Sequence, residues 1–205
     1  LVDEPIVTLE EILIKMKKEL ESWKQYKVQK TPELTEKATE KLSKEIQGFE
    51  DEISNFSSGI YVLKNYPIVR KSFTQMNKAF AETSKKYSTW RLFQIVFIVS
   101  MIPDIAACDR DLMPDDEKVK THLSDMALLY FPTGGGKTEA FLGVLVFNLF
   151  FDRHRGKSCG VTSILRYPLR LLSVQQVQRL ANVLAKAELI RRADKEICGT
   201  ECFSL

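Results

Sequence analysis

The amino-acid sequence predicts an α/β fold in which a helical N-terminal region precedes a parallel sheet with flanking helices. Three observations support this prediction. Apolar side chains recur at helical spacing through the first 87 residues. Two short hydrophobic segments, 126–131 and 160–165, are predicted to be strands, and longer helical patterns follow each of them. A glycine-rich stretch joins the first strand to its helix, and strands that alternate with helices are typical of parallel sheets.

The N-terminal region is expected to form three charged helices. The first is predicted to begin at Thr8, which together with Glu11 makes the pattern of a capping box. Thr31-Pro32 predicts the start of the second helix, because proline is favoured at the first helical position. Gly59 predicts the end of that helix. The third helix is expected between Ile68 and about Lys85.

The chain is interpreted as two domains, residues 1–87 and residues 88–205. Two alternatives stay open for the first: a helical domain that packs on itself, or a module that contacts nucleic acid or a partner protein. The elements expected in the second are a buried helix from Trp90 that breaks at Pro103, a strand at 126–131, an apolar helix at 141–151, a strand at 160–165 and a helix at 171–192. The helix at 141–151 is apolar nearly all round, so it is expected to be buried against the sheet.

Residues 131–138 read Phe-Pro-Thr-Gly-Gly-Gly-Lys-Thr and have the layout of a phosphate-binding P-loop. Such a loop turns successive backbone N–H groups around a polyphosphate, and the helix that follows places its positive end at the same point. In this pattern Lys137 would reach the β- and γ-phosphates, and Thr138 would hold Mg²⁺. Phe131 stands where the strict pattern has its first glycine. The predicted nucleotide-binding residues in this loop are Thr133, Gly134, Gly135, Gly136, Lys137 and Thr138.

The charge of the chain is uneven along its length. The net charge is +3, but nine basic residues and two acidic ones lie between Asp152 and Arg192. This basic segment fits either a polyanion partner or solvated helix faces. No run of residues approaches the roughly 18 apolar residues that a membrane span needs, and no signal peptide is recognised. A cytoplasmic protein is therefore expected.

Three stretches, taken in order, resemble the motifs of superfamily 2 helicases. Trp90-Arg91-Leu92-Phe93-Gln94 resembles the element whose glutamine binds the adenine edge in that family, which implies this role for Gln94. Residues 132–138 resemble motif I. Residues 168–175 have the spacing of motif Ia, which implies that Arg170 and Gln175 contact the nucleic-acid backbone. Leu169 replaces the threonine usual in that motif. The resemblance implies the first part of a RecA-like domain.

Finer features resemble DrmA-type helicases of the bacterial DISARM anti-phage systems. They lie at residues 131–140, 165–179 and 203–205. The resemblance implies an ATP-dependent and Mg²⁺-dependent helicase or translocase that acts on DNA, with protein partners from a defence system. The Asp-Glu box that such a motor needs to hold Mg²⁺ does not occur after the P-loop in this sequence. The chain is therefore expected to be an N-terminal portion that is inactive by itself.

Two alternative functions stay open from the sequence. A P-loop enzyme of another class, such as a small-molecule kinase or a GTPase, would explain the loop but not the motifs on either side of it. A non-catalytic helical scaffold would carry a vestigial nucleotide site, although Lys137 and Thr138 are intact. Preference for adenine, for guanine or for neither nucleotide would separate the three interpretations.

Overall fold

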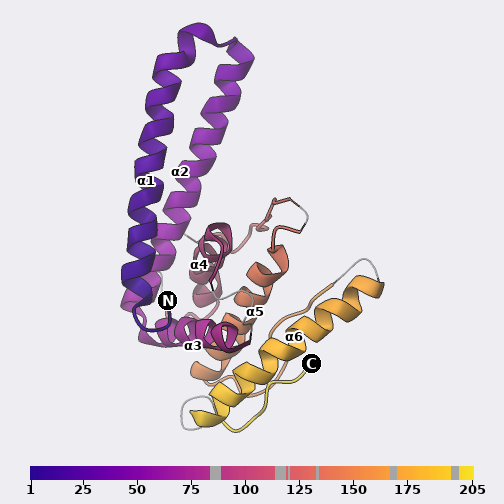
Figure 1. Ribbon diagram of the computed structural model, residues 1–205. Helices are drawn as coiled ribbons and strands as arrows, with labels where there is room; N and C mark the ends of the chain where they lie inside the picture. Colours follow the sequence, from indigo (N-terminus) through magenta and orange to yellow (C-terminus); the bar gives the residue numbers. More distant parts are fainter. Residues whose placement is uncertain (84–88, 114–118, 120, 133, 167–169, 195–198) are drawn as a thin grey trace.

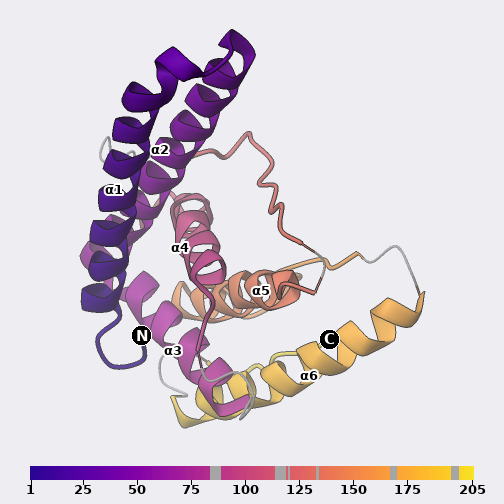
Figure 2. The same cartoon turned by 45° about the horizontal axis from the view of Figure 1, so that its top comes forward.

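Helices make up all the regular secondary structure of the part of the chain that the computed structural model describes, residues 1–83, 89–113, 119, 121–132, 134–166, 170–194 and 199–205 (Figure 1). In order these are α1 (Pro5–Lys30), the short 3₁₀ helix η1 (Thr31–Glu33), α2 (Glu36–Asn65), α3 (Pro67–Thr83), α4 (Leu92–Ala107), α5 (Lys137–His154) and α6 (Arg170–Ala193). The long hairpin of α1 and α2 extends beyond the remaining helices (Figures 1 and 2). Its base packs on the rest of the molecule through contacts between α2 and α4.

The boundaries of the hairpin helices differ from the sequence prediction. Helix α1 begins at Pro5, where the missing N–H costs nothing, and not at Thr8. The Thr8 hydroxyl lies within the helix and donates to the carbonyl of Glu4 at 3.4 Å, so the predicted capping box is wrong. Thr31-Pro32 forms the 3₁₀ turn that joins the two helices. Helix α2 is capped instead by Thr35, whose hydroxyl accepts the N–H of Ala38 at 3.3 Å.

Gly59 does not end a helix, as the sequence predicted, but lies within α2, which continues to Asn65. A Cβ atom at residue 59 would lie 2.1 Å from the carbonyl oxygen of Val99 on α4. Pro103 is likewise inside α4 and does not break it. Because proline has no N–H, it cannot donate the usual helical hydrogen bond to the carbonyl four residues earlier, which is that of Val99. The glycine of α2 therefore packs against the Val99 carbonyl of α4, which lacks its usual helical donor because residue 103 is proline.

The predicted parallel sheet is wrong: no strand occurs among the described residues. The segments 126–131 and 160–165 run without regular structure, and their apolar side chains are largely exposed, at 92% for Met126, 86% for Leu128 and 87% for Ile164. A strand is stabilised by hydrogen bonds to a neighbouring strand, and the described part of the chain contains no such neighbour for either segment. The strands were predicted from hydrophobicity and segment length alone. These two properties do not show whether a partner strand is present.

Helix α5 is buried, as predicted, but helices cover it instead of a sheet. It packs against α3, α4 and α6. Phe147, Phe150 and Phe151 are at most 1% exposed and join the same core as Phe73 and Met76 of α3. Close packing is helped by Gly143, where a Cβ atom would lie 2.4 Å from the side chain of Ile98. Three helical neighbours therefore cover most of the apolar surface of α5, although Phe141 near its start is 42% exposed.

A polar cluster joins α3, α5 and α6 beside this core. His154 Nε2 lies 2.6 Å from the Gln75 side-chain oxygen, and the Gln75 amide donates to Asp194 at 3.3 Å. Asp194 also pairs with Lys71 at 2.7 Å. Burial, together with the positive charge of Lys71, lowers the pKa of His154 to about 4, although Asp194 acts in the opposite direction.

The free energy of unfolding is expected to fall as the pH drops from 6.5 towards 4. In this range the unfolded chain protonates His154 while the folded chain keeps it neutral, so protons favour the unfolded state. Allowing for solvent screening, the loss is about 1–2 kcal/mol. Urea unfolding at a series of pH values measures it. His154→Gln, which cannot titrate, is expected to flatten this part of the profile, and an equal slope in both proteins would contradict the assignment.

Candidate phosphate-binding site

The loop before α5 has the backbone conformation that its glycines permit. Gly134 and Gly136 have φ angles of 79° and 92°, in the left-handed region where other residues are strained. Gly135 is needed for a different reason, because a Cβ atom there would lie 2.4 Å from the ring of Phe131. The Gly135 N–H donates to the carbonyl of Pro132 at 3.1 Å and closes the turn. Each of the three glycines is therefore required by the local geometry.

Helix α5 begins with the two residues predicted to act on phosphate and Mg²⁺. Lys137 is its first residue and Thr138 its second, and both are half-buried. The Lys137 ammonium group donates to the carbonyl oxygen of Phe131. Gly136, the N-cap residue, has no side chain to cap this helix end, and no side-chain cap is found there among the described residues, so the first N–H groups of α5 keep their capacity to bind an anion. Thr133, also predicted to belong to the site, lies outside the described residues.

Two residues at the start of α4 hold the loop by its carbonyl groups. The Arg91 guanidinium donates to the Gly135 carbonyl at 2.6 Å, and the Gln94 amide donates to the Gly136 carbonyl at 2.8 Å. The side-chain oxygen of Gln94 accepts the backbone N–H of Arg91, also at 2.8 Å. Gln94 is 5% exposed. The Gln94 amide, to which the sequence assigned the binding of adenine, thus supports the loop. The amide nitrogen has a second N–H group and the amide oxygen has a second lone pair beyond these two hydrogen bonds.

Aromatic contacts fix this part of α4 against the loop and against α3. The rings of Phe93 and Phe131 stack with centroids 3.9 Å apart. Trp90 donates from its indole nitrogen to the buried Asn77 at 2.8 Å, and its ring lies 4.6 Å from that of Phe80. The motif at residues 90–94 is therefore a packed element that joins the core to the phosphate loop. The sequence identified the motif but not this structural role.

Replacing Gln94 with alanine is expected to loosen the loop and the first turn of α5. Two partly buried hydrogen bonds, each worth about 0.5–1.5 kcal/mol, would be lost, which corresponds to roughly ten-fold more frequent opening. Hydrogen exchange of peptides that span residues 131–140 measures this change. Leu92→Ala, which alters a side chain that is 59% exposed on the same turn, is the control. Equal exchange in both variants would show that Gln94 does not support the loop.

Helix α6 carries the residues predicted to contact nucleic acid. It begins at Arg170, whose side chain lies outside the described residues, and Gln175 is exposed in its second turn. Val174 and Val177 are exposed beside it, at 64% and 52%. One turn after Gln175, Arg179 reaches α5 and forms an ion pair of 3.3 Å with Glu139. The structure thus brings the exposed face of α6 close to the first turn of α5, which no motif in the sequence indicated.

A buried carboxylate at the other end of α5 was missed by the sequence analysis. Asp152 is 3% exposed and accepts hydrogen bonds of 2.7 Å from Lys157 and Thr162 and of 2.7 and 2.9 Å from Arg155. Burial alone would raise the pKa of Asp152, but these hydrogen bonds outweigh it and lower the pKa below its ordinary value. Asp152 therefore holds two of the nine cations counted in the basic segment, Arg155 and Lys157, and its single negative charge offsets one of their two positive charges.

Glu188 pairs with two more of these cations and offsets one of their two positive charges. Its carboxylate pairs with Arg191 at 2.7 Å and with Arg192 at 2.9 Å, and it accepts the N–H of Phe203 at 3.1 Å. The hydrogen bonds from Arg191 and Arg192 lower the pKa of Glu188 to about 2, against the effect of burial. Four of the nine cations in the basic segment thus form ion pairs with its two carboxylates, and only part of their charge is available to a polyanion.

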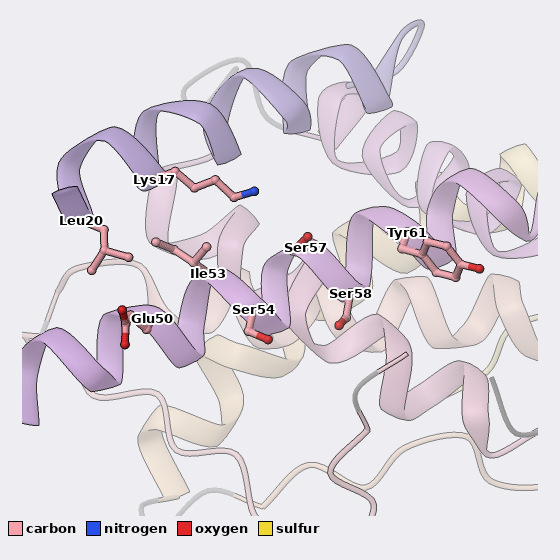
Figure 3. Close-up of a pocket in the computed structure, with 8 residues that line it drawn as sticks. All are labelled: Lys17, Leu20, Glu50, Ile53, Ser54, Ser57, Ser58 and Tyr61. Atoms are coloured by element: carbon pink, nitrogen blue, oxygen red, sulfur yellow. The ribbon is translucent and has the colours of Figure 1, made fainter. Parts of the chain in front are cut away.

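An open groove of about 510 Å³ lies on the helical hairpin, apart from the phosphate loop. Lys17 and Leu20 line it from α1, and the other lining residues come from α2, among them Ser54, Ser57 and Tyr61 (Figure 3). Glu50, at one end, pairs with Lys24 at 2.7 Å. The described residues that line this groove include none of those predicted to bind phosphate or nucleic acid. In the described part of the chain, no helix combines the length and the apolar character needed to cross a membrane.

Comparison with known proteins shows a similarity to a bacterial defence protein. No model of a protein family matches the chain. The chain is 38% identical over 115 residues to DISARM protein DrmA of Bacillus paralicheniformis. The match covers 53% of this chain and 9% of that protein, so the chain corresponds to a small part of the length of its relative. The resemblance to DrmA-type proteins that the motifs predicted is confirmed over about half of this chain.

Proposed function

We propose that this chain forms the nucleotide-binding part of an ATP-dependent helicase or translocase that acts on DNA. The observation that carries the proposal is the loop before α5. It combines two left-handed glycines, an uncapped helix N-terminus and Lys137 in the first turn. These features suit a polyphosphate, because backbone N–H groups and one cation converge at a single point.

The fit to Mg²⁺-ATP rests on few groups. Lys137 and the first N–H groups of α5 would bind the β- and γ-phosphates, and the Thr138 hydroxyl is the protein group that would contact the ion. Mg²⁺ bound between the phosphates would neutralise charge that develops during their transfer. The described residues contain no cluster of three or more carboxylate, histidine or cysteine side chains that would hold a metal ion on its own. Thr138 would therefore hold the ion through the bound nucleotide.

Nucleic-acid binding is the second part of the proposal. Gln175 is exposed on α6, and Arg170 is the first residue of that helix, so each is proposed to contact the phosphate backbone of the DNA. The similarity to a DISARM protein supports a role in anti-phage defence with protein partners from the same system. This role is proposed for the longer protein to which such a chain would belong.

Binding measurements with ATP, GTP and a fluorescent single-stranded oligo(dT) test the proposal and separate it from its alternatives. We expect binding of ATP in preference to GTP, and binding of the oligonucleotide that weakens steeply with salt. Arg170→Ala is expected to reduce the salt dependence by about one counterion. Preference for GTP would favour another class of P-loop enzyme. Absence of nucleotide binding would favour the helical scaffold and reject the proposal.

A further inference from the structure

One ion pair connects the nucleotide helix to the exposed face of α6. Glu139 on α5 and Arg179 on α6 lie 3.3 Å apart, and their side chains are 26% and 49% exposed. Glu139 follows Lys137 by two residues, and Arg179 follows Gln175 by one helical turn. Since residues four apart lie on the same side of a helix, Arg179 shares the face on which Gln175 is exposed.

The carboxylate of Glu139 lies directly beside the phosphate loop. One of its oxygens is 3.3 Å from the position that a Cβ atom would occupy on Gly136, the N-cap residue of α5. A negative charge at this position opposes the binding of a polyphosphate unless a cation compensates it. Arg179 supplies that cation. It is also half exposed, so an anion that approaches α6 from solvent has access to the same guanidinium.

We propose that Arg179 contacts the DNA backbone and that Glu139, by pairing with it, links strand binding to nucleotide binding. The inference rests on the proposed function and goes beyond it, because it names a further contact and the sign of the coupling. When a DNA phosphate draws Arg179 away, Glu139 is left uncompensated beside the phosphate loop, and affinity for the nucleotide falls. Coupling of two binding equilibria is reciprocal, so bound nucleotide weakens strand binding by the same factor.

The expected coupling is small because the ion pair is partly exposed. Pairs of this kind change an equilibrium by about two- to five-fold at low salt, and the effect is screened as salt is added. With the intact protein, the affinity for fluorescent oligo(dT) is measured by anisotropy, with and without a non-hydrolysable ATP analogue and Mg²⁺. The dissociation constant of the oligonucleotide is expected to rise by about two- to five-fold when the analogue is bound.

Two variants separate the ion pair from general repulsion between the two ligands. Glu139→Gln frees Arg179, so it is expected to bind the oligonucleotide more tightly without nucleotide and to lose the coupling. Arg179→Ala is expected to bind it more weakly and also to lose the coupling. The double variant is expected to match Arg179→Ala. Arg192→Ala, which removes another exposed cation near the far end of α6, is the control and is expected to keep the coupling.

The outcomes distinguish failure of this inference from failure of the proposed function. Equal coupling in the wild-type protein and in Arg179→Ala would overturn the role of the ion pair and leave the proposed function standing. Tighter strand binding in the presence of the analogue would overturn the predicted sign. A wild-type protein that binds neither the analogue nor the oligonucleotide would reject the proposed function, and this inference with it.

Discussion

Replacement of Lys137 by alanine is expected to abolish ATP turnover by the longer protein to which such a chain would belong, while leaving its fold unchanged. The ammonium group stands at the first position of α5 and donates only to the Phe131 carbonyl among the hydrogen bonds described. Its removal therefore costs the folded state little. Loss of a cation that contacts the transferred phosphate removes about 3–4 kcal/mol of transition-state stabilisation, or roughly 10²–10³ in rate.

Phosphate release and thermal unfolding, measured on the same preparations, test this expectation. Lys78→Ala, which removes an exposed lysine from α3, is the matched control and is expected to leave turnover unchanged. Turnover at the wild-type rate in Lys137→Ala would reject the assignment of the loop as the phosphate site. A large drop in the unfolding temperature would instead show that Lys137 stabilises the fold.

Replacement of Gly59 by valine is expected to destabilise the protein by about 1–3 kcal/mol, the usual cost of overpacking. A side chain at this position would meet the backbone carbonyl of Val99, so α2 and α4 would have to separate. For a chain of this size the loss corresponds to a decrease of about 2–10 °C in the unfolding temperature. Thermal unfolding followed by circular dichroism measures the decrease.

Gly48 provides the control on the same helix. A Cβ atom at residue 48 would contact nothing within 4 Å. Gly48→Ala is therefore expected to stabilise the protein by about 1 kcal/mol, because alanine is the better helix former. If Gly59→Ala also stabilised the protein, the close approach between α2 and α4 would be disproved.

Most helices followed from the sequence because their signals are local. The spacing of apolar residues predicted α3, α5 and α6 close to their observed bounds. One error arose where two local signals competed: Thr8 was predicted to start the first helix, but Pro5 starts it. Another arose at Gly59, which was predicted to end the second helix but lies within it. A glycine has the same local preference at the end of a helix and within one. Only the approach of α4 decides that a side chain is excluded at residue 59.

The strand predictions failed for a reason that lies outside the segments themselves. Residues 126–131 and 160–165 are hydrophobic, but a strand requires a partner for its backbone groups. Hydrophobicity does not show whether a partner is present. In the described chain α5 is covered by α3, α4 and α6, and the two segments stay exposed.

The sequence by itself determined the turn before α5, because glycines at 134 and 136 and a helix that starts at Lys137 depend on local backbone geometry. The binding of phosphate to this turn stays a prediction. The sequence also identified the motif at residues 90–94, although not its hydrogen bonds to the loop. Only the tertiary structure decided that Glu139 of α5 pairs with Arg179 of α6. Asp152 and Glu188, by contrast, pair with cations only three to five residues away in the chain. Charges interact through space, so pairing between helices depends on which helices meet and not on the order of the residues in the chain.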